Sequence, residues 1–87
     1  MKISWEADAW SDYVSWQTDK AMLKRINQLI RDIQRSPFAG ISKPEMLRHH
    51  LSGYWSRRID EENRLVYRVE DDAVTIAQCR GHYSPPQ

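Results

Sequence analysis

Residues 54–80 read YWSRRIDEENRLVYRVEDDAVTIAQCR, and this stretch decides the fold class. It contains three runs in which apolar and polar residues alternate, at 54–59, 64–69 and 73–80. Alternation with a period of two is typical of strands with one buried face. The runs are separated by the short polar segments DEEN (60–63) and EDD (70–72), and turns of this length join antiparallel neighbours. We therefore predict three consecutive strands in an antiparallel meander.

The residues before this stretch indicate one strand and two helices. KISW (2–5) alternates and suits a short first strand. A helix is expected over 6–16, with Glu6 and Asp8 near its positive N-terminal end. A second helix is expected over 20–35, where apolar residues recur every three or four positions and Thr18 or Asp19 can cap the N-terminus. Pro37 ends this helix because it disfavours helical geometry at the preceding residue.

The segment between the second helix and the meander is less regular. AGISKP (39–44) is expected to form a loop, and EMLRHHL (45–51) either a short strand or an irregular segment. The predicted order is β-α-α-β-β-β(-β), an α+β fold with two N-terminal helices packed on a mainly antiparallel sheet. A chain of 87 residues has room for one domain, which we place at 1–83. SPPQ (84–87) is expected to be a short extended tail, because its prolines cannot extend a ladder freely.

Composition excludes several classes of protein. Cys79 is the only cysteine, so neither an intramolecular disulfide nor a cysteine-based zinc site can form. Acidic residues at 6 and 8 interrupt the apolar run that a signal peptide requires, and no stretch approaches the ~18 apolar residues of a membrane span. We expect a soluble cytoplasmic protein with no membrane partner. His49 and His50 are adjacent and would point to opposite faces of a strand, which makes a poor metal pair, and no cofactor is expected.

Charge is distributed unevenly along the chain. Residues 1–19 carry one lysine against four acids, residues 20–58 nine basic residues against two acids, and residues 59–87 three arginines against six acids. A basic band of this kind is expected at a polyanion site, but it also fits a solvated helix face. The same two readings apply to the basic residues of the second predicted helix, which could follow the phosphates of a polyanion: Lys20, Lys24, Arg31 and Arg35.

The meander should have one apolar face and one face rich in arginine. Leu65, Tyr67 and Val69 share a face that can pack on the helices. The opposite face then gathers Arg64, Arg68 and one of the two arginines at 57 and 58. Guanidinium groups on a face that the core does not need suggest anion binding. The alternative is a set of cross-strand ion pairs with acids such as Glu45, Glu61 or Glu62.

Three residues could together support RNA cleavage if the fold brings them to this face. Glu45 begins the segment before the meander, Arg64 begins a strand, and His82 follows the last strand. A carboxylate can take the proton from a ribose 2′-OH, an arginine can stabilise charge on the phosphoryl oxygens, and an imidazole can protonate the leaving oxygen. The scheme requires no metal. Cys79 lies inside a predicted strand without an activating neighbour, which favours a structural role.

The segment KPEMLRHHLSGYWSRRIDEENRLVYRV (43–69), together with CRGHY (79–83), resembles the YoeB toxins of the RelE/ParE superfamily of toxin–antitoxin systems. The resemblance extends over nearly the whole chain. It implies a compact RelE-like fold similar to that of small microbial ribonucleases. It also implies an endoribonuclease, or mRNA interferase, that cuts mRNA in the A site of the translating 70S ribosome. A YefM-type antitoxin and a homodimer are the implied protein partners.

The resemblance also implies a role for each matching residue. Glu45 falls on the general base of the family, Arg64 on its transition-state arginine, and His82 on its general acid. Tyr83 matches a C-terminal tyrosine that orients the substrate. The remaining implied substrate contacts are Arg58, Arg57, Arg48 and Lys43; of the two arginines in SRR, Arg58 is the favoured phosphate ligand, and Arg48 stands where the family often carries lysine.

Two other functions fit the same fold. A ParE-like toxin would bind a protein target without cutting RNA, and its basic face would be a docking surface. The ParE branch generally lacks the set of glutamate, arginine and histidine found here. A purely structural interaction module is the third reading, and it predicts that overproduction is harmless.

Overall fold

The computed structural model describes residues 1–83, so the extended tail predicted at 84–87 lies outside the described residues. Its elements follow the predicted order. They are β1 (Lys2–Trp5), α1 (Ala7–Ser15), α2 (Lys20–Arg35), β2 (Glu45–Met46), the short 3-10 helix η1 (His49–Leu51), β3 (Tyr54–Arg58), β4 (Arg64–Glu70) and β5 (Ala73–Gln78).

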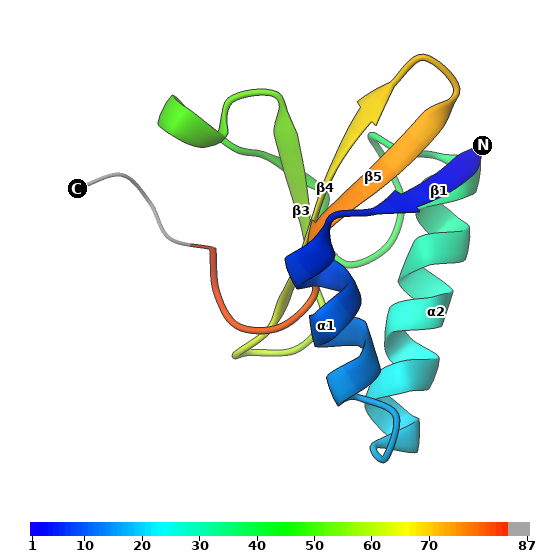
Figure 1. Ribbon diagram of the computed structural model, residues 1–87. Helices are drawn as coiled ribbons and strands as arrows, with labels where there is room; N and C mark the ends of the chain where they lie inside the picture. Colours follow the sequence, from blue (N-terminus) through cyan, green and yellow to red (C-terminus); the bar gives the residue numbers. More distant parts are fainter. Residues whose placement is uncertain (84–87) are drawn as a thin grey trace.

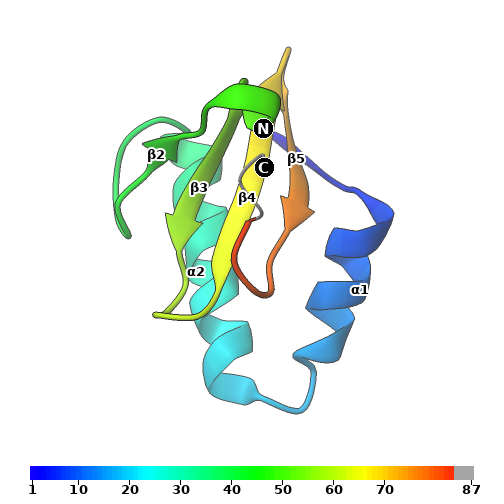
Figure 2. The ribbon, with the colours of Figure 1, turned by 90° about the vertical axis from the view of Figure 1, so that its left-hand side faces the viewer.

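The five strands form one mixed sheet in the order β1-β5-β4-β3-β2. The predicted meander is confirmed, because β3, β4 and β5 pair antiparallel, and β2 adds antiparallel to β3. The first strand pairs parallel with the last, from Lys2 beside Ala73 to Trp5 beside Ile76. Both helices lie on one side of the sheet (Figure 1). The view in Figure 2 looks onto the other side, where the C-terminal segment crosses in front of β4.

The core lies between the helices and the sheet. Helix α2 contributes Ile26, Leu29 and Ile33, all fully buried, because apolar positions spaced three or four apart share one helix face. From the sheet come Leu65 and Tyr67, which are also fully buried, as the alternation of the sequence predicted. Val69 is partly buried against the same core.

Polar contacts set the ends of the helices. The Asp19 carboxylate accepts a hydrogen bond from the Met22 backbone amide at 3.1 Å, so Asp19 rather than Thr18 caps α2. Trp16, which follows α1, donates its indole N–H to the Cys79 carbonyl at 3.0 Å. Cys79 itself is buried, and that burial raises the pKa of its thiol to about 12, in keeping with the predicted structural role. Among residues 1–83, no helix combines the length and the apolar character needed to span a bilayer.

Candidate functional site

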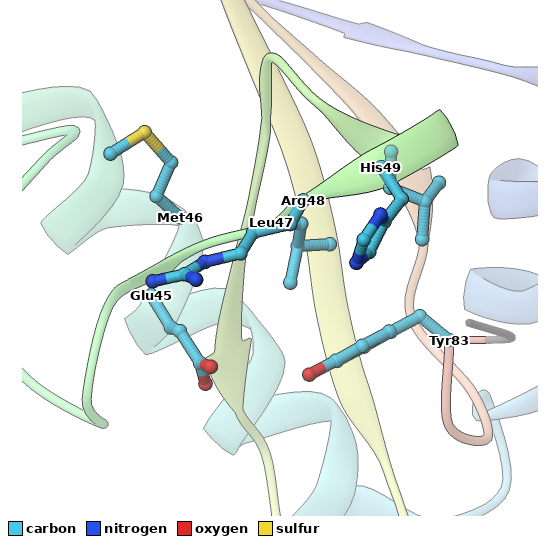
Figure 3. A pocket seen from close by; sticks show the side chains of 7 residues that line it. Glu45, Met46, Leu47, Arg48, His49 and Tyr83 are labelled. Atoms are coloured by element: carbon cyan, nitrogen blue, oxygen red, sulfur yellow. The ribbon is translucent and has the colours of Figure 1, made fainter. Parts of the chain in front are cut away.

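A hollow of about 200 Å³ lies at the side of the sheet away from the helices (Figure 3). We call it the first hollow, and its lining residues are Glu45, Met46, Leu47, Arg48, His49, Leu51 and Tyr83. Three of the predicted site residues, Glu45, Arg48 and Tyr83, therefore lie together although 35 residues or more separate Tyr83 from the others. The Glu45 carboxylate and the Tyr83 hydroxyl point toward the same space (Figure 3).

Strand pairing and one buried leucine position Glu45. Glu45 is the register partner of Ser56 in β3, which orients it toward the open face. The next residues are held by Leu47, which is 5% exposed and whose backbone amide donates to the Tyr54 carbonyl at 2.9 Å. The carboxylate itself stays exposed to solvent, where it can meet a large substrate.

The C-terminal segment is tied back to the start of β4. The Arg64 amide donates to the Gly81 carbonyl at 2.9 Å, and the Gly81 amide donates to Asn63 Oδ1 at 2.7 Å. Gln78 adds a hydrogen bond from Nε2 to the same carbonyl at 2.9 Å. Gly81 has a φ of 79°, a left-handed conformation that glycine adopts without strain, and it turns the chain back over the sheet. These contacts carry His82 and Tyr83 to the open face.

Arg64 and Arg58 lie at one end of this face. They are directly opposed in the register of β3 and β4. The Arg64 guanidinium donates from Nη1 to the carbonyls of Asp60 at 2.6 Å and Asn63 at 3.1 Å, so it is held against its own turn and does not line the first hollow. Arg58 lies 3.7 Å from the Glu61 carboxylate, which is one of the ion pairs that the alternative reading predicted.

His82 is exposed and lines neither this hollow nor its neighbour. It directly precedes Tyr83, which lines both hollows. The five ion pairs among residues 1–83 do not involve Glu45, Arg48 or His82. The described arrangement thus leaves these three groups available to a ligand.

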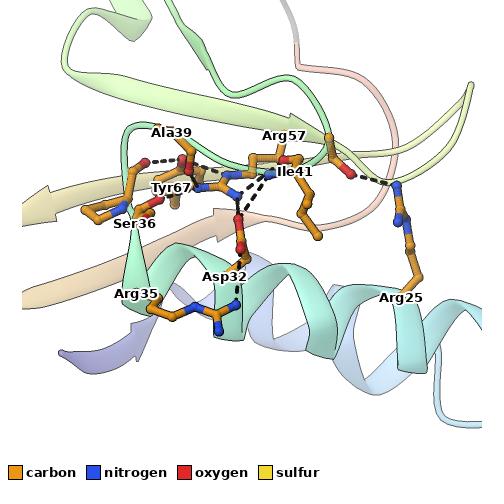
Figure 4. A network of polar contacts seen from close by, with 10 residues as sticks. Arg25, Asp32, Arg35, Ser36, Ala39, Ile41, Arg57 and Tyr67 are labelled. Carbon is orange, nitrogen blue, oxygen red and sulfur yellow. Dashed lines mark hydrogen bonds and ion pairs between the residues drawn. The ribbon is translucent and has the colours of Figure 1, made fainter.

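The prediction that Arg57 contacts substrate is corrected by its burial. Arg57 is the register partner of Leu65, so it points to the helix side, and its exposure is 0%. Its guanidinium pairs with the Asp32 carboxylate and donates from Nη2 to the carbonyls of Ser36 at 2.6 Å and Ala39 at 2.9 Å (Figure 4). Hydrogen bonding from Arg57 is the main reason that the pKa of Asp32 is lowered. Arg57 therefore fastens the loop after α2 to the sheet.

Arg68 lies on the predicted open face but is already paired. It contacts the Glu6 carboxylate from Nη1 and lies 3.0 Å from Glu70 Oε1 through Nε. Hydrogen bonding to Glu6, then to Glu70, raises the pKa of Arg68. Arg68 was one of the arginines predicted to bind an anion on this face, but its positive charge is paired with the carboxylates of Glu6 and Glu70.

The remaining predicted contacts are exposed. Lys43 lies in the loop before β2, with a φ of 53°. The basic residues of α2 are exposed as well: Lys20, Lys24, Arg31 and Arg35. Arg35 pairs with Asp32 at 3.3 Å, and its side chain is 78% exposed.

A second hollow, of about 350 Å³, adjoins the first and was not predicted. It shares Leu51 and Tyr83 with the first and is otherwise lined by Glu6, His50, Tyr54, Val66, Ala77 and Gln78. His49 and His50 lie in η1 rather than in a strand, and each lines a different hollow. The alternation in 64–69 placed Val66 on the predicted open face, but only the register of β3 against β4 puts Tyr54 on the same face. Glu6 reaches this face through the β1–β5 pairing. In the described part of the chain, no three metal-ligating side chains gather.

Comparison with known proteins gives concordant results. Residues 5–83 match the family described as the YoeB-like toxin of bacterial type II toxin-antitoxin systems. The chain is 58% identical to Toxin YoeB of Escherichia coli K12 over 84 residues, which are 95% of this chain and all of that protein. The structure of a YoeB/ParE toxin from Agrobacterium tumefaciens superposes with a TM-score of 0.93 at 50% identity, over 95% of this chain and 100% of that one.

Two Staphylococcus aureus structures are similar as well. One is a heterotetrameric complex of the YoeB-YefM toxin-antitoxin and the other a YoeB dimer. Each superposes with a TM-score of 0.88 at 46% identity, over 95% of this chain and 98% of that one.

Proposed function

This chain belongs to the YoeB-like toxin family of bacterial type II toxin-antitoxin systems, and on that premise we propose that it is a ribosome-dependent mRNA endoribonuclease. The observation that carries the proposal is the convergence of Glu45, Arg48 and Tyr83 on the first hollow, with the exposed His82 directly before Tyr83 in the chain. These groups provide a carboxylate, a cation, an aromatic ring and an imidazole at one exposed surface. Cleavage of messenger RNA in the ribosomal A site would inhibit translation.

The reaction is an internal transesterification. Glu45 takes the proton from the ribose 2′-OH, and the oxygen attacks the adjacent phosphorus. The bond from phosphorus to the 5′ oxygen of the next nucleotide breaks, which leaves a 2′,3′-cyclic phosphate. His82 gives its proton to the departing oxygen, so protons and charge balance. Each role is filled by a side chain, and no metal takes part in this scheme.

Arginines stabilise the charge that develops on the phosphoryl oxygens. Arg64 and Arg58 are cross-strand neighbours, and Arg64 is tied by its amide to Gly81, one residue before His82. For Arg64 to reach a phosphate, its guanidinium exchanges the carbonyls of its own turn for phosphoryl oxygens, a stronger charge-assisted bond. Arg48 and Lys43 bind flanking phosphates, and Tyr83 orients the substrate by stacking.

The partners follow from the same proposal. The exposed cations of α2, Lys20, Lys24, Arg31 and Arg35, contact phosphates of ribosomal RNA. A YefM-type antitoxin neutralises the toxin, as the complex of the Staphylococcus aureus relative suggests. The toxin forms a homodimer, as a YoeB dimer has been solved for that relative. We place the protein in the cytoplasm, where ribosomes are.

The test is cleavage of a defined mRNA on purified ribosomes, mapped by primer extension. Glu45→Gln and His82→Gln remove the base and the acid while keeping side-chain size. Both should lower the cleavage rate by at least about 100-fold. Glu62→Gln removes an exposed carboxylate of the 60–63 turn and should cut at the wild-type rate. If both site variants cut at the wild-type rate, the assigned roles are wrong. Cells arrested with intact messages and damaged DNA would instead indicate a ParE-like toxin.

A further inference from the structure

Tyr83 lines two adjoining hollows of different character. The first hollow holds Glu45 and Arg48, which act on ribose and phosphate in the proposed function. The second hollow shares Tyr83 and Leu51 with the first and is the larger of the two. Because the two hollows adjoin through Tyr83 and Leu51, the second is placed to receive a neighbouring residue of an RNA bound at the first.

The lining of the second hollow fits a flat, largely apolar group rather than a phosphate. Ala77, which is partly exposed, supplies apolar surface, and the nearly buried Val66 belongs to the same lining. Tyr54, Tyr83 and His50 supply rings on which a base can stack. Among the residues that the structure describes, no lysine or arginine lines this hollow. Arg68 contacts Glu6 and Tyr54 of this lining, but its charge is paired with the carboxylates of Glu6 and Glu70. A phosphate would therefore find no unpaired arginine or lysine here, whereas an RNA base would find stacking surfaces.

Two of the polar groups of this hollow, Glu6 and Gln78, present an acceptor oxygen to a ligand, whereas the hydroxyls of Tyr54 and Tyr83 and the ring of His50 can also donate. Gln78 uses its amide N–H groups on the carbonyls of Arg80 at 3.0 Å and Gly81 at 2.9 Å, so its Oε1 is the atom left for a ligand. Glu6 accepts from Arg68 through Oε2, and within residues 1–83 its Oε1 takes part in no hydrogen bond. Arg68 stays bound to Glu6 and to Glu70, so its charge is neutralised at this position.

We propose that the second hollow binds an RNA base that carries an exocyclic amino group, next to the scissile phosphate, and that Glu6 and Gln78 recognise that amino group. This inference rests on the proposed function and adds a base preference to it. Adenine, cytosine and guanine each present an amino donor to an acceptor such as a carboxylate. Uracil presents a carbonyl oxygen where cytosine has its amino group, so it would face the acceptor oxygens of Glu6 and Gln78 with another acceptor and bind less tightly.

Cytosine and uracil give the sharpest test because they differ at this group and share their size. We would measure cleavage on ribosomes of messages that carry cytosine or uracil at each position flanking the cut. At one position, the wild type should cut the cytosine message roughly tenfold faster. Glu6→Gln supplies an N–H donor in place of an acceptor oxygen and should reduce this ratio to below about threefold.

Glu70→Gln is the matched control. It also removes one carboxylate from Arg68, but Glu70 does not line the second hollow. The control should keep the tenfold ratio. Retention of the ratio by Glu6→Gln, or its loss by both variants, would overturn the inference. Equal cutting of cytosine and uracil messages by the wild type at every flanking position would overturn it as well.

A binding measurement separates failure of this inference from failure of the proposed function. Non-cleavable 2′-O-methyl trinucleotides with a central cytosine or uracil are titrated into the free protein, and NMR shifts of the Ala77 methyl and Gln78 amide are followed. The cytosine ligand should bind several-fold more tightly, and Glu6→Gln should remove the difference. If no message is cut on ribosomes, the proposed function is wrong, and this titration still decides whether the hollow distinguishes the two bases.

Discussion

The backbone amide of Arg64 donates a 2.9 Å hydrogen bond to the carbonyl of Gly81, so the first residue of β4 holds the segment that carries His82 and Tyr83. The end of a chain is ordinarily loosely held. Here the contact of Arg64, together with Asn63 and Gln78, fixes the chain immediately before the imidazole and the phenol. Two groups with proposed roles in the chemistry are thereby positioned by backbone pairing.

Gly81→Val should impair cleavage more than it impairs folding. Space is available around a Cβ at this position, but the φ of 79° is unfavourable for a β-branched residue, at a cost of about 1–2 kcal/mol. Relaxation of this strain would displace His82 and Tyr83 and lower the cleavage rate by roughly 100-fold. Asp71→Val is the control. Asp71 also has a positive φ, 52°, but it follows the C-terminal end of β4, whereas Gly81 is hydrogen-bonded to the N-terminal end of that strand. Equal rates for the two variants would contradict this positioning role.

Arg57→Met should destabilise the protein strongly. The Arg57 side chain is fully buried, and its loss would leave the Asp32 carboxylate and the carbonyls of Ser36 and Ala39 without their donor. Breaking a buried ion pair on one side costs about 3–5 kcal/mol. Arg35→Met removes the exposed partner of the same carboxylate and should change the free energy of unfolding by less than about 1 kcal/mol. Urea denaturation of both variants measures the difference, and similar midpoints would refute the assignment.

Stability should fall in acid partly because of Asp32. Hydrogen bonding from Arg57 holds the pKa of Asp32 below its ordinary value of 3.8 in the folded protein. The ionised carboxylate therefore stabilises the fold at pH values above 3.8, and this contribution is lost as pH falls through the lower, folded pKa. The difference in unfolding free energy between the wild type and Asp32→Asn should be constant near neutral pH and shrink below about pH 4. A difference that does not depend on pH would exclude this linkage.

Cys79 should resist thiol reagents until the protein unfolds. Its side chain is buried, and burial raises the pKa of the thiol to about 12, so the reactive thiolate is scarce at neutral pH. Mass spectrometry after treatment with iodoacetamide should show no adduct in native buffer and complete modification in concentrated urea. Rapid labelling of the native protein would show that the thiol is accessible.

Neutralising the cations of α2 should weaken binding to the ribosome without changing the cutting step. The triple variant Lys20→Gln, Lys24→Gln, Arg31→Gln removes three exposed charges and no buried contact. If each contacts one phosphate, the slope of log affinity against log salt should become shallower by about 2. Single-turnover cleavage at saturating toxin should keep the wild-type rate. Unchanged affinity across the salt series would leave these residues as a solvated helix face.

The sequence by itself determined the two long helices and the three strands of the meander, and it placed Arg64, Val66 and Arg68 on one face. Period-two alternation at 54–59 and 64–69 and the three-to-four spacing of α2 predicted elements that differ from the structure by a residue at most. The last strand ends at Gln78, two residues earlier than predicted. These patterns can be read from the sequence because the position of a residue in the helical or strand repeat determines on which side of the element its side chain lies.

Only the tertiary structure decided which arginine serves which face and what surrounds Tyr83. Arg57 and Arg58 are adjacent, and the alternation alone cannot say which one points to the helices. The register of β3 against β4 and the Asp32 carboxylate on α2 place Arg57 inside. Likewise, Glu6 reaches the second hollow because β1 pairs parallel with β5. Contacts between residues 60 or more positions apart depend on how the whole chain packs, and no local pattern encodes them.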